Sequence, residues 1–127
     1  MEYGFSKTVD MAYEKAVEKI TGELKKEGFG VLTEIDVKET MKKKLDVDFK
    51  KYKILGACNP PIAHKALQIE EELGLLLPCN VIVYEKEGKS VISVFNPMIM
   101  TAIIKGEEME AIAEEVTGKL RRALAAV

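Results

Sequence analysis

Two β-branched segments joined by a four-residue connection constrain the fold of this chain more than any other feature. Residues 79–85 and 90–95 are rich in valine and isoleucine, and the connection between them is Lys-Glu-Gly-Lys. A short connection that contains glycine is typical of a β-hairpin, whose strands are antiparallel. The chain is therefore expected to form a mainly antiparallel sheet.

Two long amphipathic segments lie on either side of the strands in the sequence. Apolar residues recur at helical spacing from residue 9 to about residue 26, with Thr8 placed to cap the helix, and again from 107 to 125. Gly28 follows the first segment, as glycine commonly follows a helix. Shorter strands are expected at residues 2–8, 29–35 and 52–58, and shorter helices at residues 37–45, 60–73 and 97–106.

The expected order is strand, helix, four strands with small helices inserted, and a final helix. This order predicts an α+β fold in which helices pack on one face of an antiparallel sheet. In the strand at 29–35, alternation places Phe29, Val31, Thr33 and Ile35 on one face. The length of 127 residues predicts a single domain that spans residues 1–127.

Composition narrows the classes of function. Apolar residues make up 47% of the chain and the net charge is −2, so no overall basic field attracts nucleic acid, and no nucleic-acid partner is expected. No apolar run reaches the ~20 residues that span a bilayer, so no membrane association is expected. The first residues lack the basic start and apolar core of a secretion signal, which predicts a cytoplasmic protein with reduced cysteines.

Every asparagine, proline and cysteine of the chain falls in one of three short motifs. These motifs are Ala-Cys-Asn-Pro-Pro at residues 57–61, Leu-Pro-Cys-Asn at residues 77–80 and Phe-Asn-Pro-Met at residues 95–98. The Asn-Pro pairs fit the first positions of helices, where asparagine caps and proline loses no hydrogen bond. All three motifs lie at predicted strand ends, and strand ends at one edge of a sheet can converge on a site.

The chain resembles family 302 of the domains of unknown function over essentially its whole length. The resemblance is carried by Cys-Asn-Pro and Leu-Leu-Pro-Cys together, with the segment at residues 96–98. It implies a β-α-β(4)-α fold, in the same broad class as the TATA-binding-protein fold, and it implies no DNA binding or reaction because fold does not carry function. Its hallmark positions in this sequence are Cys58, Asn59, Pro60, Pro78, Cys79 and Pro97.

The two cysteines admit four interpretations. Cys58 ends one predicted strand and Cys79 begins another, so the two thiols can meet at one edge of an antiparallel sheet. They could be buried structural thiols, a redox pair, or ligands of a soft metal such as Cu(I), with zinc requiring an additional ligand. The fourth interpretation is a nucleophilic cysteine with His64 as its base.

Further residues are candidates for the same site. His64, the only histidine, lies one turn into a predicted helix, and Met98 and Met100 supply thioether sulfur for a soft metal. Asn80 lies at a strand start, where no cap or turn occupies its amide, so it is a candidate for hydrogen bonding to a ligand.

These observations lead to three hypotheses of different classes. The first is binding of a small molecule or metal at a pocket formed by the motifs, the second is thiol chemistry, and the third is a structural module. The apolar segment at residues 98–104 favours a homodimer contact or a lid over a cavity. No cofactor or catalytic residue is identified. The candidate ligand-binding residues are Cys58, Asn59, His64, Cys79, Asn80, Met98 and Met100.

Overall fold

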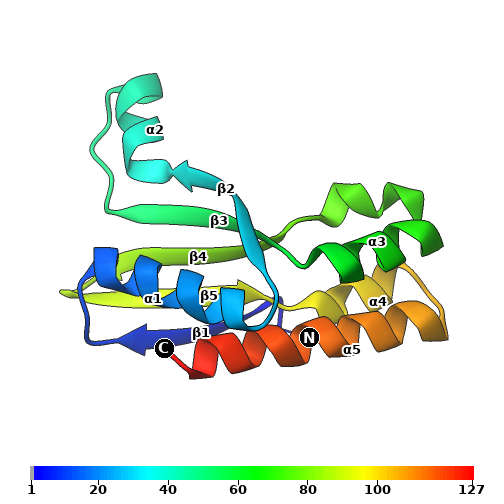
Figure 1. The fold of residues 1–127 in the computed structure, drawn as a ribbon. Helices are drawn as coiled ribbons and strands as arrows, with labels where there is room; N and C mark the ends of the chain where they lie inside the picture. Colours follow the sequence, from blue (N-terminus) through cyan, green and yellow to red (C-terminus); the bar gives the residue numbers. More distant parts are fainter. Residues whose placement is uncertain (1) are drawn as a thin grey trace.

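The computed structural model describes residues 2–127 and contains a five-stranded antiparallel sheet (Figure 1). The strand order is β1-β5-β4-β3-β2, so the first strand of the chain lies at one edge and the second at the other. The strands are β1 (Gly4–Val9), β2 (Gly30–Asp36), β3 (Tyr52–Cys58), β4 (Cys79–Lys86) and β5 (Lys89–Phe95).

Two long helices pack on one face of this sheet. They are α1 (Tyr13–Lys26) and α5 (Glu107–Ala125), which lie side by side against the strands in Figure 1. The shorter helices are α2 (Val37–Leu45), α3 (Pro60–Ile69) and α4 (Met100–Ile103), with 3₁₀ turns η1 (Glu71–Leu76) and η2 (Pro97–Ile99). The predicted α+β fold of β-α-β(4)-α type, with short inserted helices, is confirmed.

The β4–β5 hairpin forms as the sequence predicts. Lys86 pairs with Lys89, which leaves a two-residue turn of Glu87 and Gly88. Their φ angles are 52° and 78°, so both adopt the left-handed conformation of a type I′ turn, whose twist matches that of the strands.

The face prediction for β2 is wrong in its second half. Val31 pairs with Ala57, but Thr33 pairs with Gly56, so one extra residue is inserted at Leu32. This β-bulge shifts the alternation by one residue. Val31 therefore lies on the helix-covered face, whereas Thr33 and Ile35 lie on the opposite face.

The first helix begins later than the sequence predicts. Thr8 and Val9 continue the ladder of β1 by pairing with Val91 and Ser90, so Thr8 is a strand residue and not a cap. Helix α1 starts at Tyr13 after Ala12, which makes no side-chain capping hydrogen bond.

The helix expected at residues 60–73 is divided in two. Helix α3 ends at Ile69, and the carboxylate of Glu70 accepts a hydrogen bond from the amide of Glu72 at 3.0 Å. Acidic side chains are unfavourable at a helix C-terminus and favourable at an N-terminus. The run of glutamates at 70–72 therefore ends α3 and begins η1, which buries Leu73.

Helix α1 ends in a glycine turn that connects it to the core. The amide of Gly28 donates to the carbonyl of Lys25, and that of Phe29 donates to the carbonyl of Leu24. This is the Schellman arrangement, in which the residue after glycine packs back onto the helix. Both Leu24 and Phe29 are buried in the main core, between the sheet and α1 and α5.

We expect opposite effects from alanine at two glycines of this helix. A Cβ at Gly22 would meet no atom within 4 Å, so Gly22→Ala should raise the free energy of unfolding by about 0.5–1 kcal/mol. Gly28 has φ +88° and a Cβ there would lie 2.9 Å from Asn59 Nδ2, so Gly28→Ala should lower it by about 1–3 kcal/mol. Urea denaturation measures both, and equal effects would contradict this account.

Candidate functional site

The ends of β3 and β4 bring two of the three motifs together. Ala57 pairs with Cys79 in the antiparallel register, so Cys58, the last residue of β3, lies beside the first residue of β4. The strand ends that carry the two cysteines are adjacent, as the sequence predicts, and both thiols are free.

A small cavity lies where these strands meet α3 and α5. Its volume is about 40 Å³, and its lining residues are apolar except for two cysteines and one asparagine. We call it the two-thiol cavity. It is lined by Phe29, Ala57, Cys58, Asn59, Ile62, Ala63, Ala66, Leu77, Pro78, Cys79, Ile112 and Val116.

The two thiols differ in their environment. Cys79 is 5% exposed, and burial, followed by the neighbouring Cys58, raises the pKa of the Cys79 thiol to about 11. Cys58 is half-buried at the point where β3 turns into α3. At neutral pH the Cys79 side chain is therefore a neutral thiol. It loses its proton only when a cation or a hydrogen-bond donor takes the place of water in stabilising the thiolate.

Asn59 holds this corner together but does not cap α3 as predicted. Its side chain makes no capping hydrogen bond, and Nδ2 instead donates to the carbonyl of Glu27 at 3.4 Å. The amide is therefore used to join the start of α3 to the glycine turn after α1. Gly28 permits this contact because it has no side chain on the approaching side.

The other predicted ligands lie elsewhere. Asn80 pairs with Gly56 and is exposed on the face of the sheet opposite Cys79, because neighbouring strand residues alternate between faces. His64 is exposed on α3. Met100 is 3% exposed within a second core cluster, and Met98 is half-buried in η2. Of the seven predicted residues, the structure brings together Cys58, Asn59 and Cys79 in the two-thiol cavity.

The third motif has a structural role at its asparagine. Asn96 is 5% exposed, and its Oδ1 accepts from the amide of Met98 at 3.0 Å while its Nδ2 donates to the carbonyl of Glu2 at 2.8 Å. The predicted cap is confirmed here, and the same side chain fixes the segment that leads into β1.

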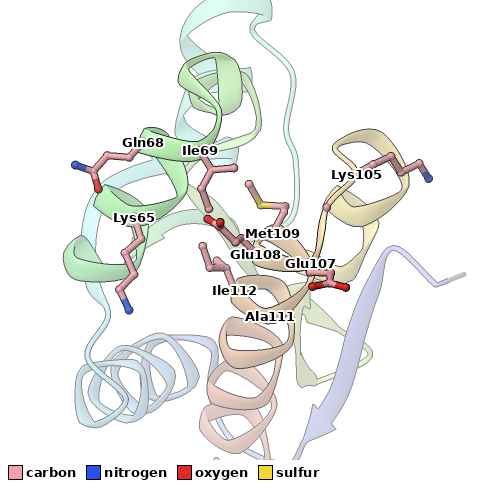
Figure 2. Close-up of a pocket in the computed structure, with 10 residues that line it drawn as sticks. Lys65, Gln68, Ile69, Lys105, Glu107, Glu108, Met109, Ala111 and Ile112 are labelled. Carbon is pink, nitrogen blue, oxygen red and sulfur yellow. The ribbon is translucent and has the colours of Figure 1, made fainter.

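A larger groove lies next to the two-thiol cavity, between α3 and the start of α5. Its volume is about 810 Å³. Figure 2 shows Ile69, Met109 and Ile112 turned toward one another inside it, while Lys65 and Gln68 lie along α3. Ile112 lines both the groove and the cavity, so the two spaces are adjacent at this side chain.

Sequence reasoning did not identify the apolar walls of the cavity as part of the site. Ile112 and Val116 belong to the apolar stripe of α5, which predicts burial but not what the buried side chains enclose. Their spacing of four residues places them on one face of the helix. This apolar stripe is the sequence feature from which the two cavity residues could have been identified.

If Ile112 controls access, its removal should expose Cys79 to alkylation. We expect Ile112→Ala to speed the reaction of native Cys79 with iodoacetamide about tenfold or more, since buried thiols react through local opening. The matched control is Ile20→Ala, which removes a fully buried side chain outside the cavity and should cost about 2–5 kcal/mol of stability. A greater acceleration by Ile20→Ala would mean that global unfolding governs access.

Two properties of residues 2–127 bear on the class of site. No group of three or more histidine, cysteine, aspartate or glutamate side chains is placed to hold a metal ion, so a metal in the two-thiol cavity would have two protein ligands of these types. Among these residues no helix is both long and apolar enough to cross a membrane.

Comparison with known proteins places the whole chain in one family. Residues 5–127 match the family described as "Domain of unknown function DUF302". A crystal structure of an uncharacterized conserved DUF302 protein from Bacillus stearothermophilus superposes with a TM-score of 0.91 at 28% sequence identity, over 99% of this chain and 98% of that chain. No curated protein matches the chain. The protein therefore belongs to the DUF302 family.

Proposed function

We propose that this protein binds a single soft metal ion, Cu(I), between the sulfur atoms of Cys58 and Cys79. The observation that carries the proposal is a cavity of about 40 Å³ whose lining residues are apolar except for Cys58, Cys79 and Asn59. Such a volume admits an ion or a water molecule, whereas pockets for organic ligands measure roughly 300–1,000 Å³. The geometry favours a metal ion over a small organic molecule.

The chemistry of the donors favours copper in its reduced state. Thiolates are soft ligands that select Cu(I), and this ion accepts two ligands in a linear arrangement. Zinc sites are almost always four-coordinate, and the cavity offers only these two thiols as charged donors. In the binding step Cu⁺ forms two copper–sulfur bonds and each thiol releases one proton.

The environment of Cys79 predicts how binding depends on pH. Because the pKa of this thiol is raised to about 11, its proton must be displaced by the metal at neutral pH. The apparent affinity should therefore rise with pH up to about 11. The apolar walls, once closed by Ile112, would keep water and oxygen from the bound ion.

Native mass spectrometry of reduced protein, loaded with Cu(I) under nitrogen in competition with a chromophoric chelator, tests the proposal. We expect one copper per chain in the wild type and none in Cys58→Ser or Cys79→Ser. His64→Ala is the matched control, since His64 is exposed and lies outside the cavity, and it should retain the metal. A wild type that takes up no copper, or copper uptake that survives loss of both cysteines, would refute the proposal.

A reversible disulfide between the same residues is the second candidate. Cys58 lies one residue beyond the Ala57–Cys79 pair, so the two Cα atoms are roughly 6 Å apart, within the range of about 4.4–6.8 Å that disulfides usually span. Because strand alternation turns Cys58 away from the face of Ala57 and Cys79, the bond also requires the end of β3 to rotate the Cys58 side chain toward Cys79. Formation of the bond would release two protons and two electrons to an oxidant such as glutathione disulfide. Oxidised protein lighter by two hydrogens and unable to bind Cu(I) would support this role.

A further inference from the structure

The face of the sheet opposite α1 and α5 carries isoleucine and tyrosine at the middle of strands β3 and β4. We call it the open face. Tyr52 pairs with Tyr84 and their rings stack with centroids 5.3 Å apart, while Ile54 pairs with Ile82. At the neighbouring edge strand Ile35 pairs with Ile54 and is 49% exposed.

This pattern is unusual for a sheet face that meets water. Antiparallel sheets with one solvated face alternate between apolar side chains inside and polar side chains outside. Here β3 and β4 carry isoleucine and tyrosine at the outward positions, and a shallow groove of about 600 Å³ runs along them. Ser6 and Ser93 lie beside Ile82 in this groove, so the tyrosines and isoleucines form an apolar patch with polar neighbours. Apolar patches rimmed by polar residues mark surfaces that another molecule covers.

Opposite charges lie at the two ends of this groove. Glu2 lies at one end, next to the start of β1, and Lys86 lies at the other end, at the close of β4. Lys50 is near Lys86 and rests over the Tyr84 ring at 5.2 Å. Among the described residues, none of these three charged groups takes part in an ion pair. One end of the open face is therefore acidic and the other basic.

We propose that a second copy of this chain covers the open face, so that the two sheets pack face to face about a two-fold axis near Ile82 and Ser93. A rotation about such an axis places each Glu2 opposite Lys86 of the partner subunit. The dimer therefore contains two equivalent attractive contacts between Glu2 and Lys86. If the strands of the two copies ran parallel, the basic ends of the two grooves would lie together.

The size of the face fits a dimer interface. Five strands about 4.8 Å apart, each with about seven residues of about 3.3 Å, make a face of about 550 Å² per copy. Two such flat faces bury about 1,100 Å². Because protruding side chains add accessible surface to a flat face, the buried area rises toward the roughly 1,200–2,000 Å² typical of specific complexes. This inference is independent of metal binding, since the two-thiol cavity lies on the other side of the sheet.

Sedimentation velocity of reduced, metal-free protein at about 50 µM tests the inference. We expect a dimer for the wild type and a monomer with an unchanged circular dichroism spectrum for Ile82→Glu. The matched control is Leu75→Glu, which adds the same charge at an 84% exposed position in η1, outside the groove, and should remain dimeric.

Charge reversal at exposed residues provides a second test, which does not require a charge to be placed at an apolar position such as Ile82. Glu2→Lys and Lys86→Glu should each raise the dimer dissociation constant by about 3–30-fold, and the double variant should restore it. A monomeric wild type, a dimer that persists in Ile82→Glu, or single reversals without effect would each overturn this arrangement. A monomer that instead binds a different protein through this face would overturn it as well.

Discussion

Alanine at Gly56 should lower the free energy of unfolding by about 2–3 kcal/mol. A Cβ at this position would overlap Thr33 Oγ1 and would lie 2.8 Å from Pro78 Cγ. Gly56 lies within β3, between the bulged strand β2 and the start of β4, so the new Cβ requires the Thr33 side chain to rotate and the Pro78 ring to shift. Urea denaturation monitored by circular dichroism measures the loss.

A double-mutant cycle separates this clash from the intrinsic effect of the substitution. Thr33→Ala removes the nearer obstacle, so the double variant should be more stable than the sum of the single effects predicts, by about 1 kcal/mol. Gly22→Ala, which has no atom within 4 Å of its new Cβ, is the matched control. Additive effects of Gly56→Ala and Thr33→Ala would show that the contact does not determine the loss.

The second large effect is a loss of stability in alkaline solution caused by Cys79. The pKa of this thiol is raised from 9.0 to about 11 by burial and by Cys58, so the folded protein holds the proton more tightly than the unfolded chain. The resulting stabilisation is fully present below pH 9 and is lost as the pH rises to about 11. It amounts to about 3 kcal/mol.

Substitution at Cys79 should remove this dependence. Plots of the free energy of unfolding against pH should fall between pH 9 and 11 for the wild type and for Cys58→Ser, and fall much less for Cys79→Ala. Tyr13, whose pKa burial raises from 10.0 to about 12, should contribute a further loss between pH 10 and 12 in every variant. An unchanged slope in Cys79→Ala would mean that the thiol is not buried as described.

Local signals were enough to predict most of the fold. The hairpin follows from a glycine turn between two β-branched segments, and α5 begins and ends where its apolar stripe does. The bulge at Leu32 could not be predicted because alternation alone does not reveal an inserted residue, and strand pairing decides it. The break after Ile69 escaped because the apolar spacing continues to Leu73, while the charges of the intervening glutamates end the helix.

The site was predictable only where residue chemistry coincides with strand ends. Cys58 and Cys79 come together because both lie at the termini of paired strands, which the sequence shows. Asn80 follows Cys79 directly, yet alternation turns it to the opposite face of the sheet. The walls of the cavity come from α3 and α5, whose relative placement depends on packing across the whole domain.

The central claim is that Cys58 and Cys79 hold one ion between them, and X-ray absorption at the copper edge of the Cu(I)-loaded protein tests it most directly. The account predicts a spectrum of two-coordinate Cu(I) with two sulfur neighbours at a single short distance and no nitrogen or oxygen neighbour. A spectrum that contains histidine nitrogen, or that has one sulfur neighbour or none, would contradict it, because His64 lies outside the two-thiol cavity.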